Sequence, residues 1–404
     1  MTYFPLRSSL LLIFSLWWVF GFVLCGDAVA QTEETVVINR SINYTGLVVT
    51  NDPGQYAMGG GTVALRGRPG AIDVNPAAIG QDGRLQAGVD VGLDPFLQSD
   101  FILGQTLTSP FAAVKSGRWA AGFQFVQFSY GTFERRSPEG QVLSEIEKYH
   151  RTLKAVGAYD LSPTWTAGAA LGYSAEGFAA DQEPSDARGL TLDLGMYGEW
   201  ERTFEDGGRI RPSLGISLTD FGTNSQVTDQ TEIATPTRLR AGGALAYETG
   251  STWEGRPIVR LTGHLALSKQ MVSIEETAGV REAVIDAASP FAALIQNWRP
   301  TDTERTFDQN GVSQRSVGVW GQVQKHVGAE ITALDIVSFR IGRNFVDDTF
   351  AVSETAVGVG VDLEYIQVDY ASTLESSSMF RGDLSYVRVT SSLPLDGTFD
   401  RLPW

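Results

Sequence analysis

Apolar and polar residues alternate along most of this chain from Arg84 onward, and this period of two constrains its fold more than any other feature. In the segment 165–173 the odd positions are apolar, and small or polar residues stand between them. Successive side chains of a β-strand point to opposite faces of the sheet. Clusters of Gly, Pro, Asp, Asn and Ser separate the alternating segments, as turns separate strands. The pattern therefore predicts an all-β, antiparallel protein.

Two kinds of fold use strands with one apolar and one polar face. One is a soluble sandwich or propeller, and the other is a transmembrane barrel, whose apolar face meets lipid. The alternating segments are long, for example 189–201 and 353–365, whereas strands of soluble sheets average ~5–6 residues. Aromatic residues stand near segment ends, as they do in membrane-interface girdles; they are Trp165, Tyr173, Trp200, Tyr247 and Tyr365. These features favour a transmembrane antiparallel β-barrel over the soluble folds.

The alternating segments predict about fourteen strands, and single-chain bacterial barrels have an even number. The expected strands are 85–93, 111–116, 119–130, 149–160, 164–175, 189–201, 209–221, 237–248, 256–268, 316–328, 334–345, 353–365, 366–373 and 381–393.

The first thirty residues have the features of a secretory signal peptide. Arg7 precedes an apolar run from Leu10 to Leu24 that is shorter than the ~20 residues of a membrane-spanning helix. Ala28-Val29-Ala30 then predicts cleavage before Gln31. A retained N-terminal anchor and lipidation of Cys25 are the alternatives. Cys25 is the chain's single cysteine, so we expect no disulfide and no cysteine-based metal site after cleavage.

Two regions interrupt the strand pattern. Residues 31–83 precede the first strand and are expected to form an N-terminal plug at the barrel mouth, and residues 84–404 the barrel itself. Ser273–Gln314 is a long insert within the barrel, in which Glu275–Trp298 is expected to be helical with an interruption at Ser289-Pro290. Long loops of such barrels are extracellular, so we expect the insert to be an exposed surface loop.

No motif in the chain supports catalysis or a cofactor, and we expect a protein that is not an enzyme. Gly59–Ala64 matches G-x-G-x-x-A, but a turn and not a strand precedes it, so nucleotide binding is not expected. His150, His264 and His326 lack metal-ligand spacing. The net charge of −16 argues against a nucleic-acid partner.

Charged residues on the polar face of the predicted strands are candidate lumen residues. They either pair across the interior and hold the barrel's shape, or form a selectivity ring; we favour the first interpretation. These residues are Arg238, Arg240, Arg260, Arg340, Asp193, Glu199, Asp362 and Glu364.

The most specific pattern is Ala57-Met58-Gly59-Gly60-Gly61-Thr62-Val63-Ala64, followed by Asn75-Pro76-Ala77 and then the first strand. This arrangement resembles the outer-membrane barrels of the fatty-acid transporter (FadL-like) superfamily, and more closely the PorV family of the type IX secretion system. Further segments that resemble this family are 161–173, 214–223, 235–242, 327–330 and 338–342. The long insert and the C-terminal extension Arg401–Trp404 depart from the family pattern.

The resemblance implies a plugged outer-membrane barrel whose exposed loops receive the C-terminal domains of secreted cargo. It also implies two protein partners, a secretion translocon and a surface sortase, besides outer-membrane lipid. A glycine-rich run allows a tight turn and close packing, and Asn75-Pro76 can fix a turn, so these residues are expected to anchor the plug. The alternatives are a transporter of hydrophobic small molecules, which needs an apolar lumen pocket, and an outer-membrane hydrolase.

Overall fold

The computed structural model describes residues 52–93, 106–137, 140–180, 185–223, 225–228, 231–233, 235–271, 274–276, 285–287, 289–308, 311–346, 353–376 and 385–395. No helix within these ranges is long and apolar enough to cross a membrane. The predicted signal peptide, the Cys25 alternative and the residues 31–51 lie outside the described residues, as does the extension 401–404.

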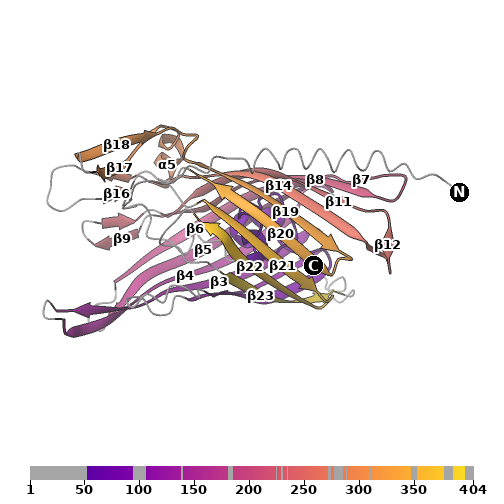
Figure 1. Cartoon of the computed structure of the whole chain (residues 1–404), viewed down its shortest axis with the longest axis horizontal. Helices are drawn as coiled ribbons and strands as arrows, with labels where there is room; N and C mark the ends of the chain where they lie inside the picture. The colour runs from indigo at the N-terminus through magenta and orange to yellow at the C-terminus, as the bar shows by residue number, and fades with distance from the viewer. Residues whose placement is uncertain are drawn as a thin grey trace. The chain divides into compact units, whose positions relative to one another are not determined.

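Fourteen antiparallel strands form a closed barrel (Figure 1). Each strand pairs with its neighbours in the order of the wall, β1 pairs with β23, and β8 pairs directly with β11. Closure leaves no wall strand with an unpaired edge, which a bilayer requires. The wall strands are β1 (Arg84–Leu93), β2 (Thr106–Ser116), β3 (Trp119–Arg136), β4 (Val142–Asp160), β5 (Trp165–Ala180), β6 (Ser185–Glu199), β8 (Arg209–Gly222), β11 (Arg238–Glu248), β14 (Val259–Gln270), β19 (Val323–Ala333), β20 (Val337–Phe345), β21 (Glu354–Asp362), β22 (Ile366–Ser376) and β23 (Ser385–Pro394).

The two ends of the barrel differ in the length of their connections. At one end, which we call the short-turn end, the strands are joined by connections such as 117–118, 334–336 and 363–365, and this end carries β7 (Arg202–Thr203) and the hairpin of β12 (Thr252–Trp253) and β13 (Arg256–Pro257). The opposite, long-loop end includes the connections 223–237 and 271–322. Because outer-membrane barrels have short periplasmic turns and long extracellular loops, the long-loop end is assigned to the cell surface.

The barrel is inside out relative to a soluble protein. Large apolar side chains such as Leu171 and Leu190 point outward and are 69% and 66% exposed, while Lys115 and Lys154 face inward and are buried. Aromatic rings gather on the outer surface at the short-turn end, where Trp119 lies against Tyr159 and Trp165 against Trp200, with ring centroids 4.4 and 5.5 Å apart. The prediction of a transmembrane antiparallel barrel is confirmed.

The long insert differs from the helical prediction. Among the described residues of Glu275–Trp298, the structure has one short helix, α5 (Pro290–Gln296), preceded by the short strands β15 (Ile274–Glu276) and β16 (Ile285–Ala287). The described start of this segment therefore pairs as strands, and Ser289-Pro290 begins the helix instead of interrupting one. Residues 316–328 are likewise not one strand, because a turn at 318–322 separates β18 (Gly311–Val317) from β19.

Two smaller sheets come from the connections at the long-loop end. β15 and β16 join β9 (Ser225–Thr228) and β10 (Thr231–Ile233) in a four-stranded sheet, in which Thr231 pairs with Ile285 in parallel. This sheet therefore ties the connection 223–237 to the connection 271–322. β17 (Thr301–Asp308) and β18 pair with each other in a separate two-stranded sheet.

Residues 52–83 lie inside the barrel, where they form a plug of three short helices and intervening turns (Figure 1). The helices are α3 (Pro53–Tyr56), α4 (Ala71–Val74) and the 3₁₀ helix η1 (Pro76–Ala78). One face of the plug packs Ile72 and Ile79 against Val156 and Ala170 of the wall. The other face packs Tyr56 against Tyr386, with ring centroids 4.8 Å apart.

Candidate functional site

The glycine run of the plug has two structural roles. Gly59 and Gly60 have φ of 81° and 78°, which residues with a Cβ rarely adopt, so they allow the turn that follows α3. Gly61 instead lies close to the wall, since a Cβ built there would be 2.8 Å from Cδ2 of His326 and nearer still to its Cβ. The run therefore combines a left-handed turn with close packing against β19.

Asn75 joins the plug to itself and to the wall. Its Oδ1 accepts a hydrogen bond from the backbone N–H of Ala77, while Pro76 occupies the first turn of η1. Its Nδ2 donates to the carbonyl oxygens of Val63 at 2.8 Å and Met196 at 3.0 Å. The residue thus closes a turn of the plug, bridges two plug segments and contacts β6, all through one buried amide.

Glycines of the barrel wall make room for the plug. A Cβ built on Gly215 would overlap the Val63 carbonyl, and one on Gly342 would overlap the backbone of Met58. The same conflict arises at Gly168 with Pro76 and at Gly195 with Asn75. The inward glycines of the strands therefore shape the lumen to this particular plug.

Two histidines of the wall hydrogen-bond to the plug backbone. His264 Nε2 lies 2.7 Å from the Met58 carbonyl oxygen, and His326 Nδ1 lies 2.6 Å from that of Gly59. A carbonyl only accepts, so each of these ring nitrogens carries the proton. His326 Nε2 is then free to accept from the Ser268 hydroxyl at 2.8 Å. No role was assigned to these histidines from the sequence, and their position among the polar residues of two predicted strands was the one available signal.

Each of the five charged residues of the plug forms an ion pair with the wall. These pairs come from four different wall strands, so they hold the plug from several sides. The pairs are Asp52–Arg388 at 2.5 Å, Arg66–Asp160 at 2.8 Å, Arg68–Glu330 at 2.8 Å, Asp73–Lys154 at 3.8 Å and Asp82–Lys115 at 3.4 Å.

Asp52 makes the most deeply buried of these contacts. Arg388 donates to Asp52 at 2.5 Å and to both carboxylate oxygens of Asp90 in β1, at 2.5 and 2.7 Å. Asp52 also accepts hydrogen bonds from the backbone N–H groups of Gln55 and Gly70. Burial alone raises the pKa of Asp52, but the positive charges of Arg388 and Arg68 outweigh it, so the pKa is lowered and the carboxylate stays ionised.

A second buried cluster surrounds Lys154, beside a bulge between β6 and β8. Lys154 Nζ lies 3.0 Å from Asp193 and 2.7 Å from Asp220, besides its pair with Asp73. Asp220 has a φ of 55°, and its backbone N–H donates to Asp193. Burial raises the pKa of Asp73, and Lys154 opposes that shift. Of the predicted lumen residues, Asp193 belongs to this cluster.

Arg238 and Arg240 lie nearby on β11, and Arg240 donates to Thr219 at 2.6 Å.

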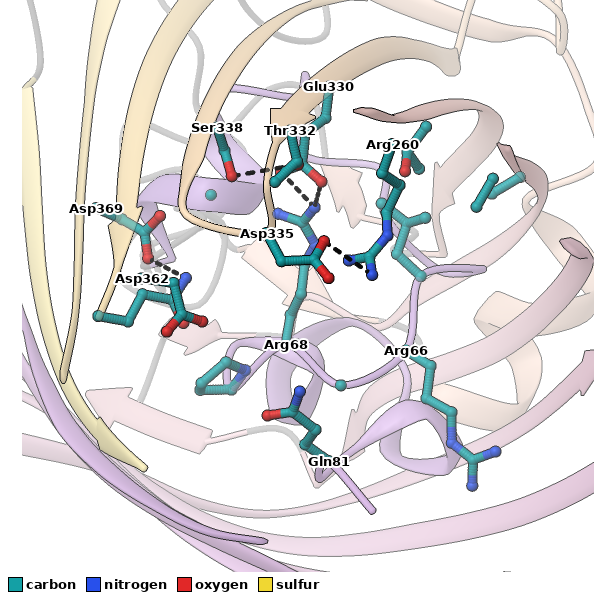
Figure 2. Close-up of a pocket in the computed structure, with 18 of the residues that line it drawn as sticks. Arg66, Arg68, Gln81, Arg260, Glu330, Thr332, Asp335, Ser338, Asp362 and Asp369 are labelled. Atoms are coloured by element: carbon teal, nitrogen blue, oxygen red, sulfur yellow. Dashed lines mark hydrogen bonds and ion pairs between the residues drawn. The ribbon is translucent and has the colours of Figure 1, made fainter. Parts of the chain in front are cut away.

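The space left between the plug and the wall is a polar cavity of about 580 Å³ that reaches the short-turn end (Figure 2). Arg68 extends from the plug toward Glu330, and Arg260 points at Asp335, 3.1 Å away. Eight arginines and eight carboxylates line this cavity. The predicted residues Arg260, Arg340, Glu199, Asp362 and Glu364 are among them.

In the part of the chain that the structure describes, none of the predicted lumen charges forms an ion pair with another. Arg340 pairs with Glu330 and, at 2.5 Å, with Asp369, while Arg260 pairs with Glu248 and Asp335. Glu199 accepts from the hydroxyl of Tyr197.

Glu364 lies outside the polar face on which it was expected. Its φ of 72° places it in the exposed turn between β21 and β22, at the rim of the cavity.

No profile of a known protein family matches the chain, and no curated protein matches it. Among solved structures, the chain is similar to the toluene transporter TodX of Pseudomonas putida, at 12% identity and a TM-score of 0.46, over 84% of this chain and 96% of TodX. It is also similar to the toluene transporter TbuX of Ralstonia pickettii, at 12% identity and a TM-score of 0.43, over 84% of this chain and 97% of TbuX. A FadL homologue of Pseudomonas aeruginosa matches 86% of this chain and 99% of its own length, at 9% identity and a TM-score of 0.40. The assignment of the barrel therefore rests on the strand pairing of this chain itself.

Proposed function

We propose that this protein is a sealed outer-membrane barrel that works as a docking component of protein secretion at the cell surface. The observation that carries the proposal is the set of five ion pairs between plug and wall. In two of these pairs, Asp52–Arg388 and Arg68–Glu330, most of each side chain is buried, and removing one partner of a buried pair costs ~3–5 kcal/mol. Together with the packing of the plug against the wall, these two pairs support a plug that stays closed. A barrel filled by a fixed plug acts through its surfaces.

The surface that fits this role is the four-stranded sheet at the long-loop end. It is built from two connections that are distant in sequence, and its outer strands are β15 and β9. An exposed sheet edge can accept an extended segment of a partner through backbone hydrogen bonds. The PorV-like pattern of the plug supports secreted proteins as the partner, with a translocon and a surface sortase as the other components. Such a role requires no catalytic group, and we propose that the protein is not an enzyme.

Transport of hydrophobic molecules is the alternative function. It requires an apolar path, whereas the cavity described above is lined by sixteen charged side chains. The polar lining therefore favours docking over hydrophobic transport.

Affinity purification tests the docking role. The tagged protein, taken from solubilised outer membranes of its host, is expected to retain secreted proteins that share a C-terminal domain, together with a large barrel translocon or a sortase. Glu232→Pro, which removes a backbone donor within β10, is expected to abolish this retention, whereas Thr252→Pro in β12 at the opposite end leaves it intact. Recovery of the barrel alone with bound lipid or fatty acid would support the transporter instead.

Conductance tests the seal. In planar bilayers the wild-type protein is expected to show no steady channel current, and the double variant Asp52→Asn/Arg68→Gln is expected to show openings. A wild-type protein that conducts steadily would contradict the sealed barrel.

A further inference from the structure

The short helix α5 has its apolar side chains on the wrong face for a helix in water. Phe291 and Ile295 are 71% and 77% exposed, Trp298 follows one turn later at 50%, and Ala293 on the opposite side is buried. A surface helix of a soluble region turns such residues inward. The arrangement on α5 matches that of the barrel wall, where the apolar face also points away from the protein.

The helix is anchored on the outer side of the wall. The ring of Phe291 meets that of Phe221 edge to face, with centroids 4.9 Å apart. Phe221 is paired with Leu192 on β6 and shares its outward direction. The barrel's lipid-facing surface therefore continues onto α5 without a polar break.

The other end of α5 is fixed two strands away. Asn297 caps the helix, and its side chain accepts a hydrogen bond from Lys269 Nζ at 2.9 Å. Lys269 alternates with the inward residue Ser268, so it lies on the outer face of β14, yet it is buried. Gln322 accepts a second hydrogen bond from the same amine at 2.5 Å. The amine that would otherwise face lipid is thus covered and satisfied.

These two anchors determine how the helix lies. Phe221 is on β8 and Lys269 on β14, and the strand between them is β11. Two strand spacings are ~10 Å, and a seven-residue helix is also ~10 Å long. The helix α5 therefore lies across the outer ends of these strands, with Ile295 and Trp298 exposed on its outer side and Phe291, though 71% exposed, touching Phe221 of the wall.

The height of Phe221 locates α5 relative to the bilayer. The backbone N–H of Trp200, in the aromatic girdle, donates a hydrogen bond to the carbonyl of Pro212 on β8, and Phe221 lies nine residues further along that strand. At ~3.3 Å per residue and a tilt of ~40°, this distance corresponds to ~20–25 Å along the barrel axis. The apolar band of such barrels is ~25 Å tall, so α5 lies at its upper edge, where a second aromatic girdle belongs.

From this geometry we infer that α5 is an interfacial helix embedded in the outer leaflet of the membrane, and that its partner is lipid. Its stripe of Phe291, Ile295 and Trp298 inserts among the acyl chains and holds one end of the connection 271–322 at the membrane surface. Trp320, exposed in the turn before β19 with Lys325 Nζ 5.0 Å from its ring, extends the same girdle. This inference stands independently of the proposed docking role.

Site-directed spin labelling tests it, because Cys25 is the only native cysteine and Cys25→Ser leaves a cysteine-free chain. A nitroxide is attached at Ile295→Cys, and the purified full-length protein is reconstituted into liposomes. Leu214→Cys on the outer wall serves as the lipid reference, and Glu205→Cys in a short turn serves as the water reference. The measured quantity is the accessibility of each label to oxygen, which concentrates in lipid, relative to a water-soluble nickel chelate.

The label at Ile295 is expected to give a ratio of oxygen to nickel accessibility that is several-fold above that of Glu205 and close to that of Leu214. A ratio equal to that of Glu205 would overturn the inference. So would a label shielded from both reagents, or one that is water-accessible in liposomes and becomes shielded only in native membranes, because these outcomes mean that protein covers the helix.

Discussion

Replacing Asp52 by Asn is expected to loosen the plug while the barrel stays folded. The substitution removes the charge that pairs with Arg388 at 2.5 Å, and the single amide oxygen of Asn can serve only part of the two backbone contacts made by the carboxylate. Arg388 keeps its two bonds to Asp90, so it is not left alone in the lumen. The loss is therefore expected at the lower end of the range for a broken buried pair, about 3 kcal/mol.

This magnitude corresponds to an increase of roughly a hundred-fold in the equilibrium constant for plug opening, since each ~1.4 kcal/mol is a factor of ten. The assay measures the rate at which a buried thiol reacts with a water-soluble reagent. Thr62→Cys in the Cys25→Ser chain provides that thiol, because Thr62 is 2% exposed within the plug and cysteine has nearly its size. When opening and closing are fast, the labelling rate follows the population of the open plug.

The matched control is Asp82→Asn, which also removes a carboxylate of the plug. Asp82 is 78% exposed in its 3.4 Å pair with Lys115, so the labelling rate is expected to change by less than about five-fold. Heat-modifiable migration in gels verifies that each barrel remains folded. Equal labelling rates for wild type and Asp52→Asn, with folded barrels, would refute the role of the ion pairs in holding the plug.

Three further predictions use the same measurements. Gly215→Ala is expected to destabilise the protein by ~1–3 kcal/mol in urea unfolding from lipid vesicles, because the added Cβ would overlap the Val63 carbonyl. Gly157→Ala, whose Cβ would have nothing within 4 Å, is expected to change stability by no more than ~1 kcal/mol. Equal effects of the two substitutions would contradict a lumen shaped to the plug. Asn75→Ala is expected to raise the labelling rate of the Thr62→Cys thiol at least ten-fold, since it leaves buried partners in Val63, Met196 and Ala77 without their hydrogen bonds at a cost of ~1–3 kcal/mol; an unchanged rate would show that this amide does not anchor the plug. The pKa of Asp52 is lowered in the folded state, so the stability it contributes is fully present above the unfolded pKa of ~3.9 and is lost as the pH falls through the folded pKa. We therefore expect the difference in labelling rate between wild type and Asp52→Asn, measured with a pyridyl disulfide that reacts in acid, to shrink only in that acidic range. A difference that vanishes near neutral pH would contradict this assignment.

The barrel wall could be predicted from local sequence patterns. The alternation in 165–173 and 190–196 records which side chains meet lipid, and most neighbouring strands are adjacent in the chain, so most of the wall can be predicted without long-range contacts. The closing pair β1–β23 is the exception. The same reasoning failed in the insert. There, β16 pairs with β10, a strand from another connection, and local spacing along the insert does not contain that pairing.

The plug shows where prediction from sequence stops. Gly59, Gly60 and Asn75-Pro76 were recognisable, because left-handed turns and capped turns are local events. The charges on the polar strand faces were recognisable as a set as well. Their partners were not: Arg340, for example, pairs with Glu330 and Asp369 on two other strands, and alternation gives only the face of a residue, not its height or its neighbour in the lumen.

The sequence by itself therefore determined an inside-out antiparallel barrel with a turn-rich segment before its first strand. Only the tertiary structure decided that five plug charges meet five wall charges, that inward glycines are spaced for the plug backbone, and that α5 lies outside the wall. The physical reason is that periodicity fixes the direction of a side chain relative to its own strand, while ion pairing and close packing depend on which distant segments closure of the barrel brings to the same level.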